Sequence, residues 1–115
     1  MAMELKVISN DDIYTHLALS GKLDIMGVGE IENKFIGYTA ARKRNALVDI
    51  SGVTFMGSMG LRLFLSAARS LGWEKKSLIL LNPQPLVNEV LEASGIEDAV
   101  VIEHNAEAAL GKAKA

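Results

Sequence analysis

The sequence predicts an α/β fold with a mixed, mostly parallel β-sheet, in which strands and helices follow one another in the order ββαβαβαβα. Two runs near the start of the chain, 3–8 and 13–20, alternate apolar and polar residues with a period of two, as half-buried strands do. Three later runs, 46–50, 77–81 and 99–102, are almost continuously apolar, which is typical of parallel strands covered on both faces. The segments between the later runs carry apolar residues at helical spacing.

Length and composition restrict the class of protein. The chain has 115 residues, half of them apolar, so we expect one domain over residues 1–115 with a core of its own. The net charge of −2 provides no basic surface for nucleic acid, and the absence of cysteine excludes disulfides and thiolate metal sites. No secretory leader and no apolar run long enough to cross a membrane is recognisable. We therefore expect a cytoplasmic protein without membrane insertion.

The first two strands are expected to form an antiparallel hairpin. Asn10, Asp11 and Asp12 are turn residues between them. His16 falls on the face opposite the apolar residues of the second strand, and we interpret it as a packing residue. His104 is far away in the sequence and no cysteine or carboxylate cluster joins the two, so no metal site is predicted.

Four helices are expected after the hairpin. The first is predicted from Asp24, a residue suited to the N-cap, to about Arg44, with a loose start because it contains several glycines. The second is predicted over 57–71, with Gly72 ending it. The third follows the segment 82–85 and ends at a left-handed Gly95, and its expected buried face consists of Leu86, Val87, Val90 and Leu91. Asn105 is expected to cap the fourth.

In open α/β sheets, functional residues gather beyond the carboxyl ends of the parallel strands. Here these positions hold Asp24, the segments 51–58 and 82–85, and His104 with Asn105. They contain no nucleophile elbow, phosphate-binding glycine loop or dinucleotide fingerprint. Asp49 lies inside its strand without the acidic neighbours that an aspartyl phosphoacceptor needs. We therefore predict no catalytic residue, cofactor or metal, and a protein that is not an enzyme. A small-molecule binder or an enzyme is kept as a third alternative, beside the two functions described at the end of this section.

The segment 48–61 is the most informative part of the chain. It runs from a strand through a short apolar loop to Gly57 and Ser58 at the start of a helix. One interpretation makes Ser58 an N-cap that accepts a hydrogen bond from a free amide of the first turn. The other makes Ser58 a phosphorylation site, because the amides and dipole of a helix N-terminus tolerate a phosphate while a partner packed beside it would not.

The same segment resembles the STAS domain, the anti-sigma factor antagonist family of bacteria. In that family the motif F-M-D-S-S-G-L leads from a strand into the second helix, and this sequence has F-M-G-S-M-G-L at 55–61. The segment G-K-L-D at 21–24 is similar to the family's G-E-L-D turn, and S-G-I at 94–96 is similar to its S-G-L. The resemblance extends over almost the whole chain and implies a STAS-like fold.

The resemblance also implies a function. It indicates an anti-sigma factor antagonist that binds an anti-sigma factor and serine kinase of the histidine-kinase-like ATPase fold, and that is switched off by phosphorylation and reset by a serine/threonine phosphatase. The phosphorylated serine of the family corresponds to Ser58. The implied partner-binding residues are Asp24, Phe55, Met56, Gly57 and Met59.

Two positions depart from the family motif. Gly57 stands where the family has an acid before the serine, and Met59 stands where the family has a second serine. These departures favour an alternative, in which the chain is a non-phosphorylated STAS subunit or scaffold of a larger signalling or lipid-transport assembly.

The sequence also leaves the oligomeric state open. A homodimer formed through the edge strand is an alternative to a monomer.

Overall fold

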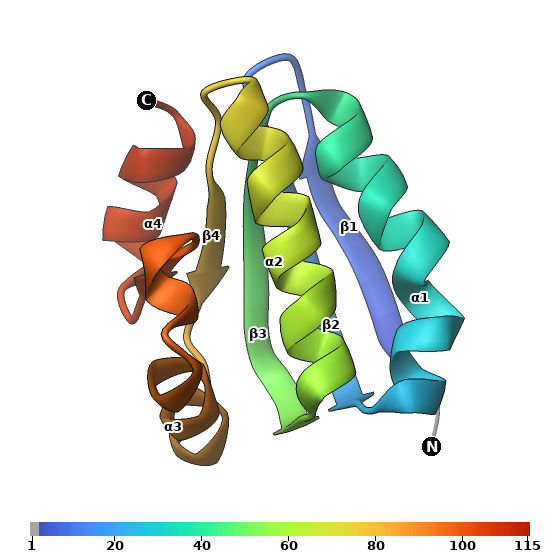
Figure 1. Cartoon of the computed structure of the whole chain (residues 1–115). Coiled ribbons are helices and arrows are strands. Elements are labelled where there is room, and N and C mark those ends of the chain that lie inside the picture. Colours follow the sequence, from blue (N-terminus) through green and yellow to red (C-terminus); the bar gives the residue numbers. More distant parts are fainter. Residues whose placement is uncertain (1–2) are drawn as a thin grey trace.

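A five-stranded mixed sheet, with strand order β1-β2-β3-β4-β5, forms the centre of the computed structural model, which describes residues 3–115 (Figure 1). The strands are β1 (Glu4–Asn10), β2 (Tyr14–Leu23), β3 (Asn45–Met56), β4 (Leu78–Leu81) and β5 (Val101–Glu103). The β1–β2 pair is antiparallel and the other neighbouring pairs are parallel. The predicted mixed sheet is confirmed.

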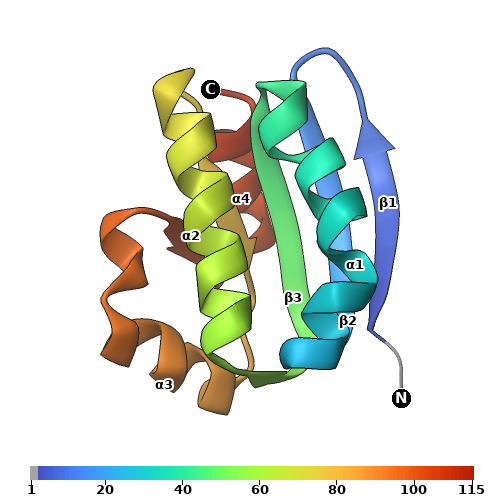
Figure 2. The same ribbon diagram turned by 45° about the vertical axis from the view of Figure 1, so that its right-hand side comes forward.

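The helices are α1 (Ile25–Tyr38), α2 (Ser58–Trp73), α3 (Pro85–Ser94) and α4 (Ala106–Ala113), with 3-10 turns η1 (Ala40–Arg42) and η2 (Ile96–Asp98). Because the parallel strands follow one another in sequence order, right-handed crossovers place α1, α2 and α3 on the same face of the sheet. Figures 1 and 2 show these helices in one layer, with α4 behind the sheet. The predicted order of strands and helices is therefore confirmed.

The main core lies between the sheet and this helical layer. At its centre the rings of Phe35 and Phe64 have their centroids 5.5 Å apart, which brings α1 against α2. A second, smaller cluster on the other face packs Leu47 and Ile79 against the alanines of α4. On this face α4 packs over β3, β4 and β5, and β1 and β2 lie beyond it.

His16 lies in β2, near the β1 edge of the sheet, and its side chain is half-buried. Its burial lowers the pKa of the imidazole, and the carboxylate of Asp49 opposes this effect by favouring the charged form. Within residues 3–115 no group of three or more carboxylate, histidine or cysteine side chains could hold a metal ion.

Several predicted boundaries were wrong. The central strand continues to Met56, because residues 51–56, predicted as a loop, pair with the end of β2. The first helix ends at Tyr38, and η1 follows it. Gly72 lies inside α2, which ends at Trp73. The last strand begins at Val101 and is only half-buried, because it lies at the edge of the sheet.

Other local predictions were confirmed. Gly95 adopts the left-handed conformation at the end of α3, with φ of 73°. The side chain of Asn105 caps α4 by accepting a hydrogen bond from the amide of Ala108, 2.9 Å away. Gly27 is required by close packing, which the sequence alone does not reveal. A Cβ at this position would lie 1.9 Å from the carbonyl oxygen of Lys22.

Asn45, at the start of β3, joins three parts of the fold through its buried side chain. Its Oδ1 accepts a hydrogen bond from the amide of Ser77 at 2.8 Å. Its Nδ2 donates to the carbonyl oxygen of Ala113 at 3.0 Å and lies 3.3 Å from that of Ala115. The side chain therefore ties the start of β3 to the segment before β4 and to the end of α4.

We expect Asn45→Ala to lower the free energy of unfolding by about 1–3 kcal/mol, because it leaves buried backbone groups without partners. Thr15→Val is the matched control, since the hydroxyl of Thr15 is buried among the described residues without a hydrogen-bond partner. Removing that hydroxyl is expected to be neutral or stabilising. Urea denaturation followed by circular dichroism measures both, and equal losses in the two variants would contradict the proposed role of Asn45.

Candidate functional site

The candidate site lies where the parallel strands end and the next helices begin. At the end of β2, Asp24 is the N-cap of α1, and its Oδ1 accepts a hydrogen bond from the amide of Gly27 at 2.8 Å. The predicted position of Asp24 at the start of this helix is confirmed. At the end of β3, the amide of Gly57 donates to the carbonyl oxygen of Leu23 at 3.0 Å. The starts of α1 and α2 are therefore neighbours.

Ser58 is the first residue of α2, and the N-cap is Gly57. The interpretation of Ser58 as the N-cap was therefore wrong. The hydrogen bond to Leu23 holds Gly57 in an extended conformation, with φ of −100° and ψ of −178°, so the helix begins one residue later. Ser58 is exposed, and no side chain caps the first turn. Among residues 3–115 its hydroxyl group has no hydrogen-bond partner, and the amides of this turn are open to an acceptor.

The first turn of α2 packs very closely against the end of β2. Gly60 is buried, and a Cβ at this position would lie 2.7 Å from the sulfur of Met56 and 2.9 Å from the Cβ of Leu23. Both distances are shorter than real contacts allow. The absence of a side chain at Gly60 is therefore a condition for the position of Ser58.

The structure divides the predicted partner-binding residues into two groups. Phe55 is exposed, and Asp24 and Gly57 are partly exposed beside Ser58. Met56 is only 5 % exposed and belongs to the core, so it offers little area to a partner, although it lines the groove beside Phe55. Because successive residues of a strand point to opposite faces, Met56 turns inward while Phe55 turns outward.

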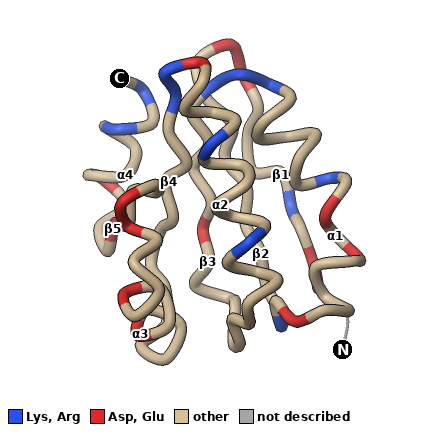
Figure 3. The backbone as a smooth tube through the Cα atoms, in the orientation of Figure 1, with Lys and Arg blue, Asp and Glu red and all other residues tan. Residues whose placement is uncertain are grey.

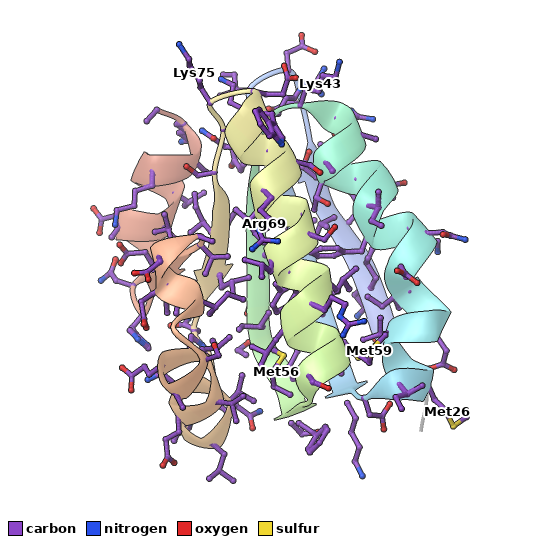
Figure 4. All side chains as sticks on the ribbon, viewed as in Figure 1. Met26, Lys43, Met56, Met59, Arg69 and Lys75 are labelled. Carbon is purple, nitrogen blue, oxygen red and sulfur yellow. The ribbon has the colours of Figure 1, made fainter. Side chains whose placement is uncertain are left out.

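Met59 takes an intermediate position. It is half-buried and lines a small groove of about 140 Å³ between α1 and α2, together with Val28 and Leu63. Figure 4 shows Met59 beside α1, Met56 behind α2, and Met26 projecting from the lower end of α1. Met59 therefore contributes mainly to the contact between the two helices.

Three exposed apolar residues near Ser58 were missed by sequence reasoning. Ile25, Met26 and Leu86 are 75 %, 77 % and 72 % exposed. Leu86, predicted on the buried face of α3, shares with Phe55 a groove of about 110 Å³. Met26 offered a signal, since it falls about 160° around the helix from the buried Val28. We call the exposed residues Ile25, Met26, Phe55, Ser58 and Leu86 the Ser58 end.

Comparison with known proteins identifies the family of the chain. The family model described as "Mlab, STAS domain" matches residues 7–103. The chain belongs to the STAS domain family. Within residues 3–115 of this STAS domain, none of the helices is both long and apolar enough to span a membrane.

Relatives of this STAS domain cover nearly its whole length. The anti-sigma-B factor antagonist of Staphylococcus epidermidis is 24% identical over 107 residues, which are 93% of this chain and 98% of that protein. The phosphorylated form of the Bacillus cell fate determinant SpoIIAA is 25% identical, with a TM-score of 0.63 and coverage of 95% and 96%. An anti-sigma factor antagonist from Mycobacterium paratuberculosis has a TM-score of 0.84 at 21% identity and shares the fold, with coverage of 98% and 95%.

We expect Gly60→Ala to destabilise this STAS domain by about 1–3 kcal/mol, because the added methyl group must displace Met56 or Leu23. Gly72→Ala is the control in the same helix. Gly72 is exposed, nothing lies within 4 Å of an added Cβ, and the change is expected to stabilise the helix by about 0.5–1 kcal/mol. Thermal unfolding followed by circular dichroism gives both values, and a stabilised Gly60→Ala variant would refute the close approach.

Proposed function

We propose that this STAS domain is an anti-sigma factor antagonist that binds its partner through the Ser58 end and releases it when Ser58 is phosphorylated. The observation that carries the proposal is an exposed, uncapped serine at the first position of α2, surrounded by exposed apolar side chains. The names of the relatives support the same function, since they include anti-sigma factor antagonists and a phosphorylated form. The proposed role is regulated binding rather than catalysis.

The apolar residues of the Ser58 end supply the affinity in this proposal. Ile25 and Met26 project from the start of α1, Phe55 from the end of β3, and Leu86 from the start of α3. Exposed apolar groups on neighbouring elements are typical of protein–protein contact surfaces. The proposed partner is an anti-sigma factor that is also a serine kinase of the histidine-kinase-like ATPase fold.

Phosphorylation would change this surface without changing the fold. The Oγ atom of Ser58 attacks the γ-phosphorus of ATP, the bond to ADP breaks, and the hydroxyl proton passes to a base of the kinase. The product carries about −1.5 to −2 charges. The open amides and the dipole at the start of α2 favour such a charge, whereas a partner would have to desolvate it. A serine/threonine phosphatase would restore the binding form by hydrolysis.

We expect Ser58→Asp to weaken binding to the anti-sigma factor of the same host at least about tenfold, because a charge must be desolvated in the interface. The melting temperature should stay the same or rise slightly, since the acid lies at a helix N-terminus. Ser70→Asp is the control, because Ser70 is an exposed serine of the same helix about 18 Å further along its axis. Isothermal titration calorimetry measures the affinities, and equal affinities of the two variants would exclude the switch.

We expect Phe55→Ala to weaken the same complex about tenfold or more, because a large aromatic side chain next to Ser58 is lost from the contact. Stability should change little, since Phe55 is already 48 % exposed. Ile13→Ala is the matched control, because Ile13 is exposed by 57 % and precedes β2 at the opposite end of the parallel strands. If both variants bind as wild type does, the partner docks elsewhere.

The departures at Gly57 and Met59 favour a second candidate function, a constitutive STAS subunit or scaffold of a larger assembly. Met59 has no hydroxyl group, so the position of the second serine in the family motif cannot be phosphorylated in this chain, and its half-buried side chain packs between α1 and α2 instead. Intact-mass spectrometry of the protein isolated from its own host, beside a Ser58→Ala variant, separates the two functions. A phosphate-sized adduct in wild type alone supports the switch. A stable complex in which Ser58 is unmodified under every growth condition supports the constitutive subunit.

A further inference from the structure

A second surface, separate from the Ser58 end, lies on the outside of the helical layer. It is an open groove of about 360 Å³ between α2 and the turn that joins α3 to η2. Leu61 and Leu65 of α2 and Ile96 of η2 form its apolar base. The groove begins one turn after Ser58 and follows α2 toward the opposite end of the helix.

Two arginines form one rim of this groove. Arg62 and Arg69 are seven residues apart on α2, so they lie about 10.5 Å apart along the helix axis and within about 20° of each other around it. The two ion pairs among residues 3–115 are Arg44–Asp12 and Lys112–Glu103, so neither rim arginine is paired. Glu32 of α1 lines the smaller groove on the other side of Arg62 without forming an ion pair with it.

The opposite rim carries the other sign of charge. Asp98 of η2 lines the groove, and it has no ion-pair partner among the described residues. Figure 3 shows this arrangement as blue segments on α2 facing red segments at the end of α3 and in η2. Figure 4 shows Arg69 on the outer side of α2, about midway along the visible helix. The groove therefore has an apolar base, a cationic wall and an anionic wall.

We propose that this groove binds an amphipathic helix of a partner protein, with acidic residues against Arg62 and Arg69 and a basic residue against Asp98. A concave groove between two helical elements fits the convex apolar face of a third helix. The unpaired charges on the two walls supply the complementarity. This interaction goes beyond the function proposed for the Ser58 end, since Arg69, Asp98 and the apolar base of the groove lie outside that end.

The positions of the charges define the sequence of the bound helix. Its acids lie about seven residues apart on one side of an apolar stripe, matching the spacing of the arginines. Lysine or arginine lies on the other side of the stripe. Reversing the direction of the helix in the groove exchanges the acidic and the basic side of its stripe. The groove therefore accepts a helix with its acids on either side of the stripe, and the side that carries the acids determines the direction in which the helix binds.

The test is a selection from a library of displayed helical peptides. Every peptide has the same leucine stripe, and the positions on both sides of the stripe are randomised between Glu and Lys. The full chain is the bait. We expect the selected peptides to have Glu at seven-residue spacing on one side and Lys on the other. Random charges after selection, or no enrichment over the starting library, would overturn the proposal.

Two bait variants locate the interaction. The double variant Arg62→Glu/Arg69→Glu should bind the selected peptides at least about tenfold more weakly and select peptides with Lys in place of Glu. Asp98→Lys should change the selection on the other side only. Unchanged selection by both variants would overturn the proposal. Binding lost equally in a Phe55→Ala bait would also overturn it, since the peptides would then occupy the Ser58 end.

Ser58→Asp separates this inference from the proposed function. It should weaken binding of the selected peptides by no more than about twofold, because an acid four residues before Arg62 competes only weakly for that arginine and leaves Arg69 and Asp98 unchanged. Suppose that Ser58→Asp leaves binding to the anti-sigma factor intact and that peptide affinity still depends on Arg62 and Arg69. The proposed switch is then wrong, and the proposed binding of a helix in the groove is supported. If decanoate, a small amphipathic anion, binds the groove with the same dependence on the arginines and no peptide does, the proposed helical occupant is wrong.

Discussion

The close approach of the first turn of α2 to the end of β2 is the constraint on which the candidate site depends. The carbonyl oxygen of Leu23 accepts the hydrogen bond from Gly57, and the side chain of Leu23 fills the space that a Cβ on Gly60 would need. Because Asp24 follows Leu23 and caps α1, one short stretch of backbone determines where both helices begin. A frame held this tightly keeps an exposed hydroxyl group in a constant position relative to its neighbours.

The same frame separates stability from recognition. The residues that hold the site together, such as Met56 and Leu23, are buried, whereas Ile25, Met26 and Leu86 are exposed and add little to the packing. Chemical change at the surface can therefore alter binding while the core stays intact. Exposed apolar side chains of this size are costly in water unless a partner covers them, and natural proteins retain such features mainly at functional sites.

The sequence was sufficient for the order of elements, because long periodic patterns decide whether a segment is helix or strand. It was insufficient for residues 51–56, whose strand conformation depends on pairing with the end of β2 rather than on local propensity. The same long-range pairing moved the N-cap from Ser58 to Gly57. Leu86 was wrongly predicted to be buried. It is one of four large apolar residues in α3, with Val87, Val90 and Leu91, and their hydrophobicity alone does not show which of them faces solvent. The exposure of Ser58 at the start of α2 agrees with the site expected from the surrounding motif, whose role stays a prediction.

The position of Trp73 affects how this protein can be studied by fluorescence. It is the only tryptophan of the chain, it is 86 % exposed, and it ends α2 about 22 Å along the helix axis from Ser58. Because the indole ring is already in water in the folded state, unfolding changes its surroundings little and its emission is a poor measure of denaturation. A molecule bound at the Ser58 end also leaves the ring untouched. A blue shift of the tryptophan emission therefore reports that a molecule covers the indole ring at the far end of α2.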